Sequence, residues 1–407
     1  MRREAATGGT RPLHPLRIYM VLESDFTQRG GGGAESQLRT LARYLRRIGH
    51  AVTVITPLLP YGPQITAERC YGLPVGRVPY PRIKVLGGII MALKVAGLLV
   101  KRRRRYDALH VHIGHNLGAM TCLIGPLLGK PVVLKISGWW ELEKGLLAPG
   151  RGPIDALSKR WLKRASVVQA LSTRIAGELE KQGFPRDKIL VLPNAVDTNR
   201  FRVRETLRAP GTPFTAVFVG RLVAEKGLGA LFEAWAQAFA GRPTGQVRLR
   251  LVGGGPLEEE LRTTAQRLGI ADQVEFLGHR DRVEEVLAEA DLGVLPSRIE
   301  GLSNTLLEFM ASGLPVLATR VSGSEDFVVT GRNGWLVDVS DVGAMAAALR
   351  EAASLSSARL TEIGRQARHD VVEAAALDAV VGKLLQLYRG GDPRALGATT
   401  PAAAEAR

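Results

Sequence analysis

The chain has 407 residues, of which 45% are hydrophobic and 23% are charged. This length exceeds what one hydrophobic core normally supports, so we expect two domains, and the composition excludes a mainly disordered protein. The 2 cysteines are too few for a disulfide framework, which favours a reduced, cytoplasmic protein.

Basic residues are concentrated in one half of the chain. The first 207 residues carry 34 Lys and Arg against 14 Asp and Glu, and the remainder has a net charge of −4. A basic half joined to a slightly acidic half indicates that one half faces something anionic. Nucleic acid, a lipid surface and phosphorylated substrates all satisfy this condition, and charge does not choose among them.

Short apolar runs alternate with longer amphipathic segments, the pattern of a parallel sheet covered by helices. Residues 1–15 form a basic extension that lacks the apolar core of a secretory signal. We assign residues 16–205 to a first doubly wound, Rossmann-like domain. Its expected strands are Leu16–Leu22, Ala51–Thr56, Ala108–Ile113, Val132–Ile136, Val167–Leu171 and Ile189–Leu192.

One segment of this first half raises the question of a membrane. Val85–Val100 is largely apolar and is followed by the basic run Lys101–Arg105. The segment is shorter than the roughly 20 apolar residues that span a bilayer, and Lys94 interrupts it. It predicts a helix packed against the sheet. The alternative is peripheral attachment to the inner face of the cell membrane, with the basic run at anionic headgroups.

The second half repeats the pattern after a polar, Arg-rich segment at residues 197–212. We assign residues 206–375 to a second Rossmann-like domain, residues 376–389 to a helix that packs back on the first domain, and residues 390–407 to a flexible tail. The strands expected in the second domain are Phe214–Val219, Val247–Val252, Val274–Leu277, Leu292–Leu295, Pro315–Ala318 and Gly334–Val337.

Two loops that follow first strands are suited to phosphate. Arg29–Glu35 contains four glycines and opens a helix, so its backbone can approach a ligand closely and offer free N–H groups. Alternatively, it is a turn that needs small residues. In the second domain, Arg221 and Lys226 lie five residues apart on a strand-to-helix turn, where both can converge on one diphosphate. Solvated surface charges are the alternative.

A third element carries two carboxylates. The strand at 292–295 ends in a turn that holds Glu300, and Ser303 and Gly313 are the expected start and stop of a short helix. Glu308 lies in this helix with apolar neighbours on both sides. A lone carboxylate there would be costly, so a ligand hydroxyl is a sensible partner, although Glu308 is alternatively an ordinary surface residue.

Together, Gly220-Arg221-Leu222, Glu225-Lys226-Gly227 and the two glutamates with seven residues between them resemble the family 4 retaining glycosyltransferases, which have the GT-B fold. Val252–Leu257 and Val274–Gly278 stand at the expected places, and the likeness runs from about residue 16 to 388. It implies transfer of a sugar from a nucleoside-diphosphate sugar with retention of configuration. A UDP-sugar is the commoner donor in the family and GDP-mannose the second. The basic first half and the segment 85–105 together favour a lipid-linked or cell-envelope glycan as the acceptor.

The resemblance also implies residue roles. Arg221 and Lys226 would hold the diphosphate and stabilise charge on the departing nucleotide. Glu300 would contact the sugar hydroxyls and Glu308 the ribose, whereas His112 matches a sugar-contacting histidine. The implied catalytic residues are thus His112, Arg221, Lys226 and Glu300. The implied donor-binding residues are Gly32, Gly33, Gly220, Arg221, Lys226, Gly278, Glu300, Gly301, Leu302, Ser303, Asn304 and Glu308.

On the acceptor side, Trp139 and Trp140 predict a stacking platform for a sugar or a membrane-interface contact, with ordinary loop packing as the alternative. No Asp-x-Asp pair occurs in the sequence, so we expect neither a metal nor any other cofactor. A glycoside hydrolase would leave the Arg221 and Lys226 site unused. An epimerase of the same fold stays open. A nucleic-acid-binding protein is disfavoured because the run 101–105 lacks interleaved aromatic residues, so we expect no nucleic acid partner.

Overall fold

The computed structural model describes residues 14–24, 26–27, 32–59, 64–81, 83, 86–150, 152–203, 211–243 and 245–397. Residues 1–13 of the predicted N-terminal extension and residues 398–407 of the predicted tail lie outside this part. The strands are β1 Arg17–Val21, β2 Ala51–Pro57, β3 Ala67–Cys70, β4 Leu73–Val78, β5 Ala108–Val111, β6 Val132–Ile136, β7 Val167–Ala170, β8 Ile189–Val191, β9 Phe214–Val219, β10 Val247–Val252, β11 Val274–Gly278, β12 Leu292–Leu295, β13 Val316–Thr319 and β14 Gly334–Val337.

The helices follow the strands in alternation. They are α1 Gly33–Arg47, α2 Leu86–Lys101, α3 Asn116–Leu127, α4 Trp139–Glu143, α5 Pro153–Leu162, α6 Thr173–Lys181, α7 Leu228–Phe239, α8 Glu258–Arg267, α9 Val283–Ala288, α10 Asn304–Ala311, α11 Ser324–Phe327, α12 Val342–Ser354, α13 Ser357–Ala375 and α14 Leu377–Tyr388. Short 3₁₀ helices are η1 Arg186–Lys188, η2 Ala224–Lys226, η3 Ala271–Gln273 and η4 Pro393–Leu396.

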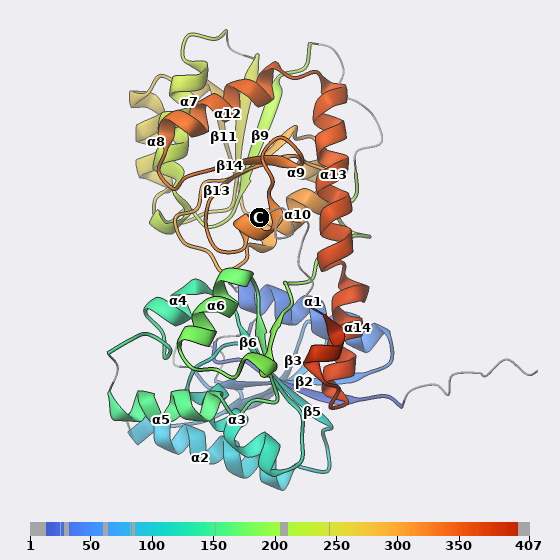
Figure 1. Cartoon of the computed structure of the whole chain (residues 1–407). Coiled ribbons are helices and arrows are strands. Elements are labelled where there is room, and N and C mark those ends of the chain that lie inside the picture. The colour runs from blue at the N-terminus through green and yellow to red at the C-terminus, as the bar shows by residue number, and fades with distance from the viewer. Residues whose placement is uncertain are drawn as a thin grey trace, which may run out of the picture.

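Two sheets form two lobes, one above the other in Figure 1. The N-terminal sheet has the strand order β3-β4-β2-β1-β5-β6-β7-β8, and the C-terminal sheet has the order β11-β10-β9-β12-β13-β14. All strand pairs are parallel except β3 with β4. Helices cover both faces of each sheet, as parallel connections require. The predicted pair of doubly wound α/β domains is confirmed.

Sequence reasoning missed the antiparallel hairpin formed by β3 and β4. Its segments, AERC and LPVGRV, mix charged, Gly and Pro residues, so neither forms the apolar run by which the other strands were recognised. The turn between them places Tyr71 and Gly72 at positive φ. The hairpin therefore extends the sheet at its edge, where a strand needs only one apolar face.

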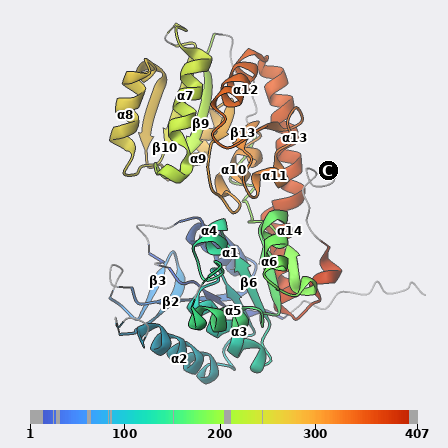
Figure 2. The same cartoon turned by 60° about the vertical axis from the view of Figure 1, so that its left-hand side comes forward.

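The chain passes from one lobe to the other twice, first near Val196 and again near Ala376, and these two crossings are in contact with each other. The long helix α13 packs on α10 in the C-terminal lobe, whereas α14 packs on α1 and β6 in the N-terminal lobe (Figures 1 and 2). Between them, Ala376 pairs with Val196 of the first crossing, through Val196 N–H to Ala375 O (2.9 Å) and Leu377 N–H to Val196 O (3.1 Å). Beyond α14, η4 folds against η1 and β8, so the predicted tail is ordered as far as Gly397.

Apolar packing is continuous between the lobes. One cluster of buried side chains includes Val111 and Leu134 of the N-terminal sheet together with Leu302 and Leu306 of the C-terminal lobe. Helices α7, α8 and α12 cover the opposite face of the C-terminal sheet with a core of their own. Within the described ranges, no helix is long and apolar enough to cross a membrane.

Close backbone contacts explain several glycines of the C-terminal motifs. A Cβ on Gly253 would stand 1.9 Å from Gly220 O, and one on Gly255 would stand 2.4 Å from Leu222 O. Gly227 has φ +66° and ends η2, and its Cβ would stand 2.0 Å from Pro296 O. These glycines let the loop at 220–227 lie directly against its neighbours, which positions Arg221 and Lys226.

Gly227→Ala should destabilise the protein by at least about 2 kcal/mol, because the left-handed conformation and the contact with Pro296 both disfavour a side chain. Gly229→Ala is the matched control, since its Cβ would enter open space on the surface of α7 and is expected to stabilise by about 0.5–1 kcal/mol. Thermal unfolding followed by circular dichroism measures both changes. Equal unfolding temperatures for the two variants would contradict this role of Gly227.

Candidate active site between the lobes

Both lobes line a cavity of about 700 Å³ at the carboxyl ends of their central strands, where open α/β sheets place ligands. From the N-terminal lobe come the start of α1 and the segment after β6. From the C-terminal lobe come the loop after β9 and the loop that leads into α10. The lining residues are Glu23, Ser24, Gly32–Glu35, Ile113, Lys135, Ser137–Trp140, Asn194, Gly220, Arg221, Val223, Glu225, Lys226 and Ile299–Thr305.

The structure brings three of the predicted charged residues to this cavity. Arg221 is exposed on the loop after β9. Lys226 Nζ lies 2.5 Å from Glu300 Oε1, and that oxygen also accepts a hydrogen bond from Ser297 Oγ (2.9 Å). The two loops of the C-terminal lobe thus hold an ion pair at the cavity wall. The positive charge of Lys226 and the negative charge of Glu300 compensate each other.

Direct contacts between the lobes close one side of the cavity. Asn304 Nδ2 donates to Gly33 O (3.1 Å), and Asn194 Nδ2 donates to Asn304 Oδ1 (2.8 Å). A Cβ on Gly301 would lie 2.7 Å from Gly138 Cα, so the backbone of the loop at 300–305 rests on the N-terminal lobe. The helix α10 then begins at Asn304, and its free N–H groups face the cavity. This arrangement suits an anion held between the lobes.

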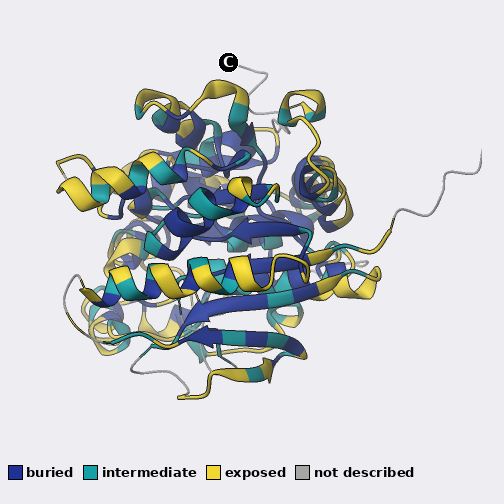
Figure 3. Ribbon diagram, turned by 90° about the horizontal axis from the view of Figure 1, so that it is seen from below, coloured by how far each residue is buried: buried dark blue, intermediate teal, exposed yellow. Residues whose placement is uncertain are grey.

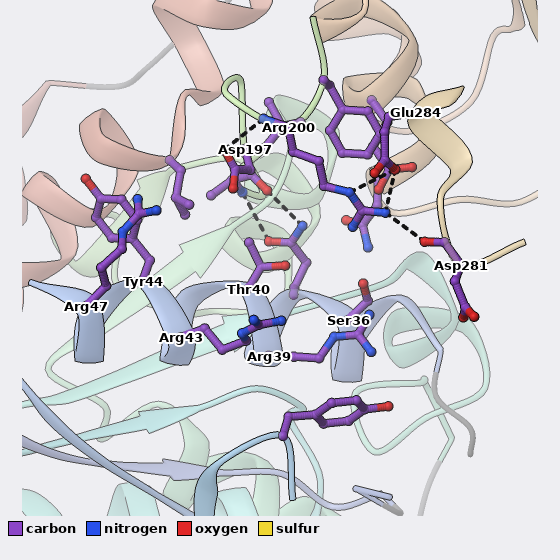
Figure 4. Close-up of a pocket in the computed structure, with 18 residues that line it drawn as sticks. Ser36, Arg39, Thr40, Arg43, Tyr44, Arg47, Asp197, Arg200, Asp281 and Glu284 are labelled. Carbon is purple, nitrogen blue, oxygen red and sulfur yellow. Dashed lines mark hydrogen bonds and ion pairs between the residues drawn. The ribbon is translucent and has the colours of Figure 1, made fainter. Parts of the chain in front are cut away.

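Figure 4 shows a second cavity of about 700 Å³. Asn304 lines both cavities, which therefore adjoin each other. One wall is the polar face of α1 with Arg39, Arg43 and Arg47, and the other wall carries Asp281, Glu284 and Glu308. Arg200 from the first crossing lies between them, with its Nη2 2.8 Å from Glu284 Oε2. Each cavity offers an elongated ligand side chains of both charges, since Glu35 and Glu300 line the first cavity beside its cations.

Glu308 lines the second cavity rather than the first. Burial raises the pKa of this carboxyl to about 7, although Arg200 and Arg39 act in the opposite direction. Among the described residues, no hydrogen bond or ion pair satisfies the Glu308 carboxyl group. Glu308 thus lies in a largely apolar helix and, in the part of the chain that the structure describes, has no protein partner for its carboxyl group.

Two predicted site residues lie away from both cavities. His112 follows the end of β5, is fully buried and stacks on His110 at 4.2 Å between ring centroids, under α14. Ile113 and Lys135 line the first cavity, whereas His112 does not. Gly278 ends β11 at φ +64°, and its carbonyl accepts the N–H of Gly253 (2.8 Å). Neither residue lines either cavity, so the structure does not bring them together with the other predicted site residues.

The remaining predicted residues line the first cavity: Gly32, Gly33, Gly220, Gly301, Leu302, Ser303, Trp139 and Trp140. The two tryptophans begin α4. Trp139 Nε1 donates to Glu143 (2.6 Å) and its ring faces the Arg174 guanidinium at 4.8 Å, whereas Trp140 is 45% exposed. The partly free Trp140 ring is the better placed of the two to contact a ligand.

Sequence reasoning missed three charged residues of the N-terminal wall. Glu23 follows β1, and its carboxylate accepts from Leu117 N–H (2.6 Å) and contacts His115 Nδ1 (2.7 Å). Glu35 opens α1 and accepts a short hydrogen bond from Ser24 Oγ. Lys135 lies inside β6. Its signal in the sequence was a single lysine in the otherwise apolar strand VVLKI.

Metal ligands do not gather here. Over the described ranges, the structure has no group of three or more His, Cys, Asp or Glu side chains that could hold a metal ion. The cationic groups of the cavity are instead Arg221, Lys226 and Lys135.

Two facing Rossmann-like lobes with a ligand cavity between them define the GT-B class of proteins. HepE of Anabaena, solved in complex with UDP, has this fold: it matches with a TM-score of 0.72 and 20% identity over 92% of this chain and 100% of its own. The likeness establishes the fold of this protein.

Sequence comparison then establishes the family. The model for Glycosyltransferase Family 4 matches residues 31–200, and the model for glycosyl transferases group 1 matches residues 213–354. The 2-deoxystreptamine N-acetyl-D-glucosaminyltransferase of Streptomyces fradiae is 30% identical over 388 residues, which cover 86% of this chain and 87% of that protein. The chain belongs to the family 4 glycosyltransferases.

A further relative matches in part. The putative colanic acid biosynthesis glycosyltransferase WcaL of Salmonella typhimurium is 34% identical over 239 residues. The match covers 57% of this chain and 58% of the Salmonella protein, so the chain spans little more than half of that relative's length.

Proposed function

We propose that this protein transfers a sugar from a nucleoside-diphosphate sugar to a hydroxyl group of a glycan acceptor. The observation that carries the proposal is the placement of Arg221, Lys226 and Glu300 on one wall of a cavity that the opposite lobe closes. Arg221 and Lys226 bind the diphosphate and stabilise the charge that develops on the departing nucleotide. Glu300 then exchanges its contact with Lys226 for the hydroxyls of the transferred sugar.

The nucleoside extends from the diphosphate past Asn304 into the second cavity, where Glu308 accepts the ribose hydroxyls. This placement gives the buried carboxyl of Glu308 the partner that it lacks in the described chain. We favour uridine as the base, which the complex of HepE with UDP supports, and GDP-mannose is the second choice. A screen of nucleotide sugars by thermal shift, followed by mass spectrometry of products, tests the donor.

The acceptor enters from the N-terminal lobe, where Trp140 offers a stacking surface. The relative from colanic acid biosynthesis supports a cell-envelope polysaccharide or a lipid-linked precursor as the acceptor class. The closed contact between the lobes excludes water and so protects the glycosyl group from hydrolysis. An epimerase would have no use for such an acceptor surface, and the same product analysis separates the two functions.

Arg221→Ala and Lys226→Ala are each expected to lower kcat by about 10²–10³-fold, because each removes a cation that stabilises the leaving diphosphate. Release of nucleoside diphosphate in a coupled assay measures the effect. Arg267→Ala removes an exposed arginine on α8 of the same lobe and serves as the control with unchanged turnover. Turnover like that of the unmodified protein in both cavity variants would place the diphosphate elsewhere.

We also propose that the reaction needs no metal and retains the anomeric configuration. Arg221 and Lys226 offer the positive charge that a metal would otherwise supply, and membership of the family supports retention. Turnover is expected to persist in EDTA, and the anomeric proton coupling of the product is expected to match that of the donor sugar. Loss of activity that Mg²⁺ or Mn²⁺ restores would contradict the first part, and an inverted product the second.

The N-terminal lobe has a surface suited to an anionic membrane. Helix α2 buries Met91, Val95 and Leu99 against the lobe but also exposes apolar residues on its outer side, among them Leu93 at 62% exposure. Exposed positions of this face are yellow in Figure 3, which views the molecule from below. The fully exposed basic run 101–105 continues directly from the helix. We propose that this surface holds the enzyme on anionic lipid near a lipid-linked acceptor.

Substitution of Arg102–Arg105 by Gln should reduce flotation of the protein with vesicles that contain phosphatidylglycerol, because each basic residue near the surface contributes about 1 kcal/mol to binding. The charge-matched control replaces Arg242, Arg262, Arg267 and Arg350 of the C-terminal lobe by Gln. No flotation of the unmodified protein, or an equal loss in both variants, would remove the support for this surface.

A further inference from the structure

A buried lysine lies at the N-terminal side of the cavity without a partner in the protein. Lys135 is the fourth residue of β6, is 1% exposed and lines the cavity. Within the described part of the chain, its ammonium group makes no hydrogen bond and no ion pair. Buried ammonium groups are normally paired, because removing the charge from water is costly.

The carboxylate that acts on Lys135 belongs to Glu141, and it already accepts hydrogen bonds from the neighbouring loops. Glu141 accepts hydrogen bonds from Gly114 N–H (2.7 Å), Ser137 N–H (2.6 Å), Ser137 Oγ (2.7 Å) and Gly138 N–H (3.1 Å). These contacts hold the loop after β6 in place. Glu141 therefore acts on Lys135 only through space, where it favours the charged form.

The other polar neighbours are neutral. Burial lowers the pKa of His110 to about 3 and lowers the pKa of His112 well below its usual range. Burial also lowers the pKa of Lys135 to about 7, so its ammonium and amine forms are both populated near neutral pH, and an anion bound beside it would favour the ammonium form. Gln169, its neighbour in register on β7, directs its amide nitrogen to Leu192 O (2.9 Å). Among the described residues, no carboxylate therefore contacts the Lys135 ammonium group directly, and Glu141 acts on it only through space.

Lys135 also stands on the wall opposite Arg221 and Lys226. The N-terminal lobe also contributes Ile113, Ser137 and Trp140 to the cavity lining. The diphosphate site is already supplied with two cations by the other lobe. A third cation on the acceptor side therefore serves a different group of the substrates.

We propose that Lys135 binds an anionic group, a carboxylate or a phosphate, that a substrate carries on the part facing the N-terminal lobe. The inference rests on the proposed function, since it assumes that the sugar and the acceptor meet in this cavity. The anion has two possible sources: an acidic donor sugar, such as a uronic acid, or an acidic group on the acceptor. In either case Lys135 makes the enzyme select a charged substrate over its neutral analogue.

Calorimetry with two matched probe pairs distinguishes the sources. UDP-glucuronate against UDP-glucose tests the donor, and glucose 6-phosphate against glucose in saturating UDP tests the acceptor. The unmodified protein is expected to bind the charged member of one pair about 10- to 100-fold more tightly. Lys135→Met should abolish this preference, Lys135→Arg should retain part of it, and Lys181→Met, an exposed lysine of the same lobe, should leave it unchanged.

Thermal unfolding separates binding from a merely structural role. Without ligand, Lys135→Met should unfold at the same or a higher temperature, because it removes a buried charge that has no partner. The inference would be overturned if the unmodified protein showed no preference for the charged probe, or if Lys135→Met retained that preference. It would also be overturned if Lys135→Met unfolded at a lower temperature with the preference unchanged. Failure of the unmodified protein to bind UDP would instead count against the proposed function.

Discussion

The close approach of the two lobes at Gly301 is the constraint on which the candidate site depends. A side chain at this position would stand 2.7 Å from Gly138 Cα and 2.9 Å from Ser137 O, so the loop at 300–305 can rest on the N-terminal lobe only as bare backbone. Further contacts extend the junction, with Ser172 Oγ 2.8 Å from Ser322 Oγ and Thr173 N–H 2.8 Å from Asp326 Oδ2. The same loop carries Glu300 and leads into α10. Contact between the lobes and presentation of the proposed donor-binding groups are therefore one structural feature.

The lysines on the two sides of this junction differ in whether they have an acidic partner. On the C-terminal side, Lys226 and Glu300 form an ion pair, which keeps both groups at the cavity at little cost while no donor is bound. On the N-terminal side, Lys135 is buried and has no such partner in the described chain. A fold under selection for stability alone would replace it by an apolar residue. Its presence at a cavity wall is the reason to connect it with a ligand.

The two crossings of the chain set how the lobes can move. Because Val196 pairs with Ala376 and Leu377, both crossings lie at one place, and α13 and α14 meet there with each helix fixed to a different lobe. A rotation that opened the cavity would change the backbone at this point and release the contacts of Asn304 with Gly33 and Asn194. Opening around a donor would thus also have to break the apolar packing that the two lobes share.

The sequence by itself determined the two doubly wound domains, because most of the strands are short apolar runs that can be recognised without knowledge of their packing. It also placed Arg221, Lys226 and Glu300 on loops that follow strands of the second domain, and backbone geometry brings such loops to the same edge of the sheet. Glu308, in the middle of α10, lines the second cavity instead.

Tertiary structure decided the rest. The edge hairpin β3–β4 lacks an apolar run, so only its pairing with β2 makes it a strand. His112 and Lys135 are both polar residues at the ends of neighbouring strands, yet one is enclosed beneath α14 and the other reaches the cavity. That difference depends on which helix covers each side chain and on how closely the second lobe approaches. Both are long-range contacts, and no local pattern in the chain encodes them.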